Sequence, residues 1–421
     1  MPTISSISAR WILDSRGLPT VYCEVEIDQN GRKYEGNAGV PSGASTGTYE
    51  ALELRDGGSD FHGKGVTQAV SHVNQAIAVA AVNREFSSAA ELDEFVLELD
   101  GTENKTEFGA NAILAVSMAA HRAFASLYGL ELFQYLRRLY FSNLPAHLKF
   151  PRLMCNVING GAHADNTIDI QEFMVIPNGG NVERDVQIAS EIYHTLKGKL
   201  KKDGYSTSLG DEGGFAPQLK DTVQALDYLK EAITASGYKT AECELAMDAA
   251  ANEFYDAEKK VYKLDGQELS AAALTDFYRN LQENYPLISI EDGFNEDDVL
   301  GWQLLTERIG SKISLIGDDL FVTNPKRFEE IGLKNSIANG VLIKLNQIGT
   351  VFETCKMINL AKENGYITAV SHRSGETTDD FISDLAVAAQ SEFIKLGAPA
   401  RGERVAKFNR LLMIYEMSKN V

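Results

Sequence analysis

The chain has 421 residues, of which 44% are hydrophobic and 24% charged, and its formal net charge is −19 at pH 7. This length and balance fit a globular protein with two domains and a large core. The negative charge argues against direct binding to nucleic acid or to an anionic membrane, because phosphate groups would be repelled. A small phosphorylated ligand is not excluded, since a local pocket can be basic on an acidic protein.

No targeting or membrane segment is expected. The start, MPTISSISARW, lacks the basic stretch and long apolar core of a signal peptide. No stretch approaches 18 uninterrupted apolar residues, so no membrane span is expected either. The four cysteines, Cys23, Cys155, Cys243 and Cys355, lie far apart without a CxxC pair. We therefore expect free thiols in a reducing cytoplasm, and the sequence leaves open a surface or secreted pool that forms without a signal peptide.

The first part of the chain predicts a small α+β domain. Residues 11–40 have the alternation of a three-stranded β-meander, with the hairpin pair Asn30-Gly31 between TVYCEVEI and RKYEGNAGV. Helical patterns follow near residues 66–84, 90–98 and 109–128, and Gly129 fits the end of the last helix. The segment LYFSNLPAHLKFP indicates a connection. We place the two domains at 1–138 and 139–421.

The second part repeats one unit. Short apolar runs end in polar residues at a spacing close to that of a βαβ unit, roughly 30 residues, with helical patterns between them. The runs are CELAM ending at Asp248, PLISI at Glu291, ISLIG at Asp318, GVLI at Lys344, YITAV at Ser371 and His372, and SEFI at Lys395. Six such units in series predict a closed eight-stranded α/β barrel of the TIM type.

In such a barrel the carboxyl ends of all strands share one face, where active sites lie. The residues that end the six runs would therefore converge on one mouth. A single charged residue at the end of a strand is most often only the start of a polar loop. Six in succession, three acidic and then mostly basic, favour a functional site.

Three carboxylates at one mouth, from Asp248, Glu291 and Asp318, would repel one another unless a cation joins them. Oxygen ligands without His or Cys favour Mg²⁺ or Mn²⁺ over zinc. Lys344 lies opposite, near a second lysine, Lys395, whose like charge would lower the pKa of Lys344 and make it a general base. A metal opposite a lysine base suits removal of a proton α to a carboxylate, because the intermediate needs strong positive charge nearby.

Seven motifs carry a resemblance to a known family. They are VPSGASTGTYE at 40–50, NVINGGAHADNTIDIQEFMV at 156–175, GDEGGFAP at 210–217, SIEDGFNEDD at 289–298, GDDLFVTNP at 317–325, LIKLNQIGT at 342–350 and SHRSGET at 371–377. Over nearly its whole length the chain resembles the enolase family, in its bacterial form. In the wider enolase superfamily a Lys or His base works with one or two Mg²⁺.

The resemblance implies an enolase-type barrel and a glycolytic and gluconeogenic hydro-lyase. Its reaction would be the reversible dehydration of 2-phosphoglycerate to phosphoenolpyruvate and water. Asp248, Glu291 and Asp318 would hold one Mg²⁺, and Ser45 would hold a second Mg²⁺ that arrives with the substrate. Whether Asp319 is a ligand or lies behind the ligands stays open. A homodimer or a larger homo-oligomer is also implied.

The resemblance also implies the roles of the other site residues. Lys344 would remove the C2 proton, with Lys395 beside it to lower its pKa. Glu212 would act as the general acid on the departing C3 hydroxyl, with Glu172 nearby and His163 in contact with the substrate. The remaining implied substrate contacts are Gln171, His372, Lys395, and Arg373 with Ser374 around the phosphate, which suits the paired donors of an arginine.

Two other functions compete with this one. A racemase or lactonising enzyme of the same superfamily would need no phosphate clamp, so Arg373, Ser374 and Glu212 argue against it. A non-enzymatic role in surface or assembly binding stays open as a second role only, because the acid, base and metal ligands are all present in the sequence.

Overall fold

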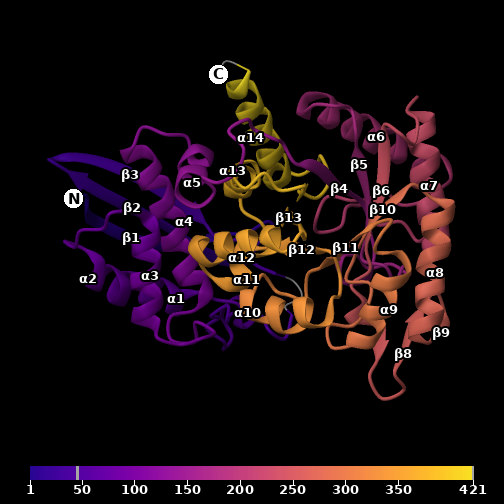
Figure 1. The fold of residues 1–421 in the computed structure, drawn as a ribbon, viewed down its shortest axis with the longest axis horizontal. Helices are drawn as coiled ribbons and strands as arrows, with labels where there is room; N and C mark the ends of the chain where they lie inside the picture. Colours follow the sequence, from indigo (N-terminus) through magenta and orange to yellow (C-terminus); the bar gives the residue numbers. More distant parts are fainter. Residues whose placement is uncertain (44–46, 420–421) are drawn as a thin grey trace.

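The computed structural model describes residues 1–43 and 47–419, so the predicted ligand Ser45 lies outside the described residues. The chain forms a three-stranded sheet covered by helices, in indigo and purple, beside a closed barrel that takes up the rest of the molecule (Figure 1). The fold class predicted from the sequence is confirmed.

The N-terminal sheet is antiparallel, with β1 (Thr3–Leu13), β2 (Pro19–Gln29) and β3 (Arg32–Gly39) in that order. The predicted meander is present, but its first strand begins well before residue 11. A β-bulge between Ile4 and Ser6 shifts the register of β1. Because a bulge breaks the two-residue period, the alternation that reveals a strand is lost there.

Helices cover one face of this sheet. They are η1 (Asp60–Gly63), α1 (Thr67–His72), the π-helix η2 (Val73–Ile77), α2 (Ala78–Ala81), α3 (Ala89–Asp100), α4 (Ala110–Leu127) and α5 (Leu132–Tyr140). The central helix α4 lies directly against β3 at Gly36, where a Cβ atom would collide with the backbone of Ala119. Gly129 follows α4 with a positive φ of 64°, as expected of a residue that ends a helix.

The barrel has eight strands in the closed order β10-β11-β12-β13-β14-β4-β5-β6. Their bounds are β4 (Arg152–Asn159), β5 (Glu172–Pro177), β6 (Cys243–Asp248), β10 (Leu287–Glu291), β11 (Ser314–Gly317), β12 (Gly340–Ile343), β13 (Ile367–Ser371) and β14 (Phe393–Lys395). The six apolar runs of the sequence are the last six of these strands. All neighbouring pairs are parallel except the two that β5 makes, with β4 and with β6.

The expectation that every strand points its carboxyl end to the mouth is therefore wrong for β5. The segment between β4 and β5 holds only the short helix η3 (Gly161–His163), whereas a parallel neighbour needs a longer crossover, usually a helix. The reversed strand brings its first residue, Glu172, to the mouth instead of its last.

Helices surround the barrel, and a small sheet extends from it. The helices are α6 (Val182–Lys202), α7 (Thr222–Ala235), η4 (Ala251–Phe254), α8 (Ala271–Asn284), α9 (Val299–Ile309), α10 (Pro325–Arg327), the π-helix η5 (Phe328–Leu333), α11 (Leu345–Ile348), α12 (Val351–Glu363), α13 (Phe381–Ala388) and α14 (Gly402–Ser418). The small antiparallel sheet consists of β7 (Tyr255–Asp256), β8 (Val261–Leu264) and β9 (Gln267–Leu269). Apolar side chains such as Met174, Ile316 and Leu342 form a separate buried cluster contributed by the barrel strands.

All four cysteines are free, as predicted, and the structure also buries all four. Cys23 lies in β2 of the N-terminal sheet, whereas Cys155, Cys243 and Cys355 belong to the barrel and its helices. Within the described ranges no single helix is long and apolar enough to cross a membrane; only α4 and α5 together pass such a test, and they meet at a bend of 99°.

Candidate active site

The register of three neighbouring strands lines up carboxylates at the mouth. Glu172 of β5 lies opposite Asp248 of β6, and Asp248 lies opposite Glu291 of β10. All three side chains are buried. Three buried carboxylates at one level would strongly disfavour the fold without positive charge beside them.

Lys395, at the end of β14, supplies that charge. Its Nζ atom lies 3.1 Å from Glu172, 3.1 Å from Asp248 and 2.9 Å from Glu291. Burial lowers the pKa of Lys395, but these carboxylates outweigh it and hold the pKa well above its ordinary value. Lys395 is therefore a charged ammonium at the centre of an acidic cluster.

Lys344 follows β12 and forms an ion pair with Asp318, which follows β11. Asp318 also accepts a hydrogen bond of 2.7 Å from Gln347 in the next helix, α11. Burial lowers the pKa of Lys344, and Arg373 and Lys395 lower it further, but the carboxylate of Asp318 outweighs them. The pKa of Lys344 is therefore raised, whereas the sequence predicted a lowered value. Lys395 does lower the pKa of Lys344, as predicted. The prediction left out the carboxylate of Asp318, which raises this pKa by more.

Asp292 was not assigned a role from the sequence. Its backbone has a positive φ of 42°, and the two oxygens of its carboxylate accept hydrogen bonds from the backbone N–H groups of Asp318 (2.9 Å) and Asp319 (2.8 Å). One oxygen from each of these three carboxylates lies within 4.8 Å of the others. Burial and the neighbouring Asp318 raise the pKa of Asp319 to about 7. Asp292 thus fixes the turn that presents Asp318.

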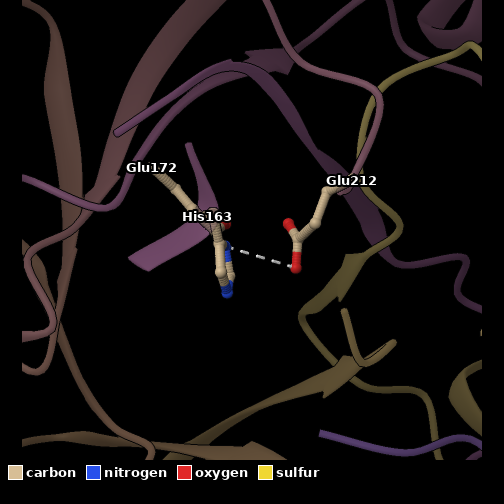
Figure 2. Close-up of side chains that lie close together, drawn as sticks. All are labelled: His163, Glu172 and Glu212. Atoms are coloured by element: carbon tan, nitrogen blue, oxygen red, sulfur yellow. Dashed lines mark ion pairs between the residues drawn. The ribbon is translucent and has the colours of Figure 1, made fainter. Parts of the chain in front are cut away.

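A second group of side chains lies on the other side of the mouth. His163 Nδ1 is 3.4 Å from Glu172 and 3.7 Å from Glu212, and Figure 2 shows the carboxylate of Glu212 directed at this ring. Burial raises the pKa of Glu212, but His372, His163 and Lys395 bring it well below its ordinary value. Burial and the charge of Glu212 raise the pKa of Glu172. Of the two carboxylates, Glu172 therefore has the higher pKa and binds a proton more readily than Glu212, which the sequence predicted to be the acid.

Arg373 is held by a carboxylate from the N-terminal part of the chain. Its Nη1 and Nη2 atoms donate to the two oxygens of Glu50 at 3.0 and 3.2 Å, and Nη1 also donates to Asn346 at 3.2 Å. Both side chains of the pair are buried. A carboxylate bound in this bidentate way occupies one edge of the guanidinium, and a phosphate that binds through the same edge would have to displace it. Glu50 was not singled out in the sequence.

These side chains line one cavity. The predicted residues among its lining are His163, Gln171, Glu172, Glu212, Asp248, Asp318, Lys344, His372, Arg373, Ser374 and Lys395, and Asp319, Asp292 and Glu253 also line it. Glu291 lies behind the wall, fully buried against Lys395. The structure thus gathers the predicted set, apart from Ser45, which it does not describe.

An eight-stranded barrel whose mouth combines carboxylates with lysines, histidines and an arginine defines an α/β-barrel enzyme with a site for a small anion and a hard cation. Residues 4–136 match the family model for the enolase N-terminal domain, and residues 147–420 match that for the enolase C-terminal TIM barrel domain. The chain is 52% identical over 418 residues to the enolase of Natranaerobius thermophilus and 50% identical over 418 residues to that of Corynebacterium kroppenstedtii. Each alignment covers 99% of this chain and 96% of the relative. The chain belongs to the enolase family.

Proposed function

We propose that this chain is a phosphopyruvate hydratase of glycolysis and gluconeogenesis that interconverts 2-phosphoglycerate with phosphoenolpyruvate and water. Identity of about one half with two bacterial enolases over almost the whole chain supports this activity. The structural observation that supports this activity is that a candidate base and a candidate acid group lie on opposite sides of the mouth of the barrel. Lys344 lies on one side, and Glu172, Glu212 and His163 lie on the other.

Lys344 is the proposed base for the C2 proton. Its ammonium must first lose a proton to solvent before the amine can accept one, and the pair with Asp318 stabilises the ammonium, so this pair must be weakened in the working enzyme. His163 Nδ1 faces Glu172 and Glu212, and a proton on this nitrogen can pass to either carboxylate. We therefore assign the protonation of the departing C3 hydroxyl to this group, with Glu212 as the donor and Glu172 as the store of the proton.

Arg373 and Ser374 are the proposed phosphate contacts, and Gln171, His372 and Lys395 complete the proposed substrate pocket. A buried guanidinium binds a phosphate through paired donors. Binding would require the carboxylate of Glu50 to leave Arg373, since both anions use the same edge.

The residues at the mouth fit Mg²⁺. The donors are carboxylate oxygens, which suit a hard cation. Asp248, Glu291 and Asp318 are the proposed ligands of a first ion, and Ser45 that of a second, while Asp292 orients the backbone N–H groups of Asp318 and Asp319. Bound Mg²⁺ would supply positive charge to the carboxylate of the substrate and draw Asp318 away from Lys344.

We also propose a division of labour in the chain and an assembly. Residues 1–138 would cap the site, and residues 139–421 would carry the chemistry. A homodimer or larger homo-oligomer in the cytoplasm fits the exposed apolar side chains of Trp11, Leu13 and Phe61, with the rings of Trp11 and Phe61 5.6 Å apart.

The test is the absorbance of phosphoenolpyruvate as it forms from 2-phosphoglycerate, with Mg²⁺ and with EDTA. Activity should require Mg²⁺, and Lys344→Ala should lower kcat by about 10²- to 10⁴-fold, the range expected for a general base. Lys326→Ala, which removes an exposed lysine that pairs with Glu103, is the matched control and should keep full activity. A folded wild type that is inactive with Mg²⁺ would refute the function. Full activity in Lys344→Ala would move the base elsewhere.

A further inference from the structure

Arg404 of α14 is fully buried behind the mouth and has no part in the chemistry above. Its guanidinium donates to three backbone carbonyls, those of Arg373 (2.6 Å), Ser374 (2.7 Å) and Asp211 (3.1 Å). The first two carbonyls belong to the proposed phosphate contacts themselves, and the third belongs to the residue before Glu212. One side chain therefore ties the phosphate loop to the loop of the proposed acid.

A fourth contact of Arg404 determines the protonation of a histidine. Its Nη1 atom lies 2.7 Å from Nδ1 of His372. A guanidinium has only donors, so Nδ1 must be the acceptor and carries no hydrogen. Burial, together with the charge of Arg404, lowers the pKa of His372 to about 3, so the ring is neutral at physiological pH. A neutral imidazole without a hydrogen on Nδ1 carries it on Nε2.

This Nε2–H faces Glu212. Nε2 lies 3.3 Å from the Oε2 atom of Glu212 and is buried without a formed hydrogen bond to any residue that the structure describes. Asn156 donates to the same oxygen at 3.0 Å. The other oxygen, Oε1, is the one that faces His163. Asn156 therefore holds Oε2, the ring nitrogen of His372 lies beside the same oxygen, and Oε1 is left for proton transfer.

The groups around His372 are closely packed beside a glycine. Gly397, with a positive φ of 74°, lies where three groups of the site meet. A Cβ atom at this position would lie 2.6 Å from the carbonyl oxygen of Glu212, 3.0 Å from Cε1 of His372 and 3.1 Å from Cδ of Arg404. The absence of a side chain at Gly397 therefore lets the backbone of Glu212, the ring of His372 and the side chain of Arg404 come close together.

We propose that Arg404 is a positioning residue that holds His372 in the Nε2–H tautomer, so that this N–H orients the carboxylate of Glu212 and leaves its second oxygen free to exchange a proton. The proposal rests on the role given above to Glu212. Without Arg404, Nδ1 of His372 could carry the hydrogen, and Nε2 would then direct a lone pair at Glu212, which would turn the carboxylate away.

The tautomer can be measured in the wild-type chain. Histidine labelled with nitrogen-15 is incorporated, and the ring signals are recorded at neutral pH, with His372→Gln used to identify those of His372. Nε2 should have the shift of a protonated ring nitrogen and Nδ1 that of an unprotonated one. A hydrogen on Nδ1, or on both nitrogens, would overturn the proposal.

Variants then test the catalytic consequence. Arg404→Met should mix the two tautomers and lower kcat by about ten- to a hundredfold with little change in KM, and Arg404→Lys, which keeps the charge and donors, should restore part of both. Arg401→Gln is the matched control, because Arg401 donates to Gly210 and Ser15 instead; it should keep the His372 signals of the wild type.

The outcomes separate the two proposals. An inactive wild type with the expected spectrum would refute the function and leave the tautomer assigned, whereas an active wild type with a hydrogen on Nδ1 would refute the positioning role alone. If Arg404→Met does not fold, the wild-type spectrum and the Arg404→Lys variant still test the proposal. The proposal would be rejected if Nδ1 of His372 carries the hydrogen in the wild type and if Arg404→Lys leaves both kcat and the His372 signals unchanged.

Discussion

At the scale of single residues, the mouth pairs each buried cation with carboxylates. Lys395 contacts Glu172, Asp248 and Glu291; Lys344 contacts Asp318; and Arg373 contacts Glu50. Buried ion pairs of this kind contribute little net stability, but removal of one partner leaves an uncompensated charge. The pairing therefore keeps reactive side chains charged and in place at a site where an anionic substrate must compete for them.

Glu50→Gln tests this competition. The amide keeps the shape of the side chain but loses the negative charge that binds Arg373, so the substrate phosphate should displace it more easily. We expect KM for 2-phosphoglycerate to fall about fivefold, which corresponds to about 1 kcal/mol, and inhibition by inorganic phosphate to strengthen similarly. Steady-state kinetics measure both.

Glu103→Gln is the control, because Glu103 is an exposed carboxylate that pairs with Lys326 instead of Arg373. It should leave KM unchanged. A KM that rises in Glu50→Gln would mean that Glu50 holds Arg373 in its binding position and does not compete with the phosphate.

At the scale of elements, the N-terminal domain caps a helix of the barrel. Ser117 of α4 accepts a hydrogen bond from the backbone N–H of Val351 (2.9 Å), and Asp93 of α3 accepts one from that of Phe352 (3.0 Å). Ser117 in turn donates to Asp93 at 2.8 Å. The first N–H groups of a helix have no partner within it, so these contacts complete α12. Since α12 follows Lys344 after one short helix, the N-terminal domain helps to place the base.

Asp93→Asn should change how stability depends on pH. Burial raises the pKa of Asp93 to about 8, whereas an aspartate in the unfolded chain titrates near about 3.9. Between these values the native state keeps a proton that the unfolded chain has released, so stability falls as pH rises from about 4 to about 8 and then levels off. The asparagine does not titrate but can still accept from Phe352. The melting temperature of the variant should therefore gain on that of the wild type between pH 5 and pH 8.

Glu98→Gln changes an exposed carboxylate of the same helix, α3, and should melt in parallel with the wild type at every pH. Parallel curves for Asp93→Asn would mean that Asp93 is ionised in the native protein throughout this range.

The sequence predicted those elements whose evidence is local. Each of the last six barrel strands is a short apolar run with a polar residue at its end, and the site residues at those ends lie in the sequence itself. The reversed direction of β5 was missed, because pairing partners are not visible in a single strand. Asp292 and Arg404 were missed for a similar reason, since their roles depend on backbone groups far away in the chain. The pKa of Lys344 was predicted in the wrong direction because its nearest carboxylate could not be identified.

At the scale of the whole molecule, the two domains share many buried polar contacts. Arg122 of α4 pairs with Asp379 (2.6 Å) and Asp380 (2.9 Å), which precede α13 of the barrel, in addition to the cap on α12. If one domain opened alone, buried charges and helix-end N–H groups in the other would lose their hydrogen-bond and ion-pair partners. The N-terminal domain and the barrel should therefore unfold as one cooperative unit.

The buried cysteines allow the cooperative unfolding of the two domains to be tested by the rates at which their thiols react. Burial raises the pKa of the thiols of Cys23 and Cys155, so neither reacts with a thiol reagent until its own domain opens. In a variant that keeps only Cys23, the rate of thiol labelling reports opening of the N-terminal sheet. In a variant that keeps only Cys155, it reports opening of the barrel. We expect the two thiols to be labelled at the same rate in dilute denaturant. Faster labelling of Cys23 would show that the N-terminal domain opens while the barrel stays folded. Buried thiols that have no catalytic role thus allow the order in which the two domains open to be measured in this enzyme.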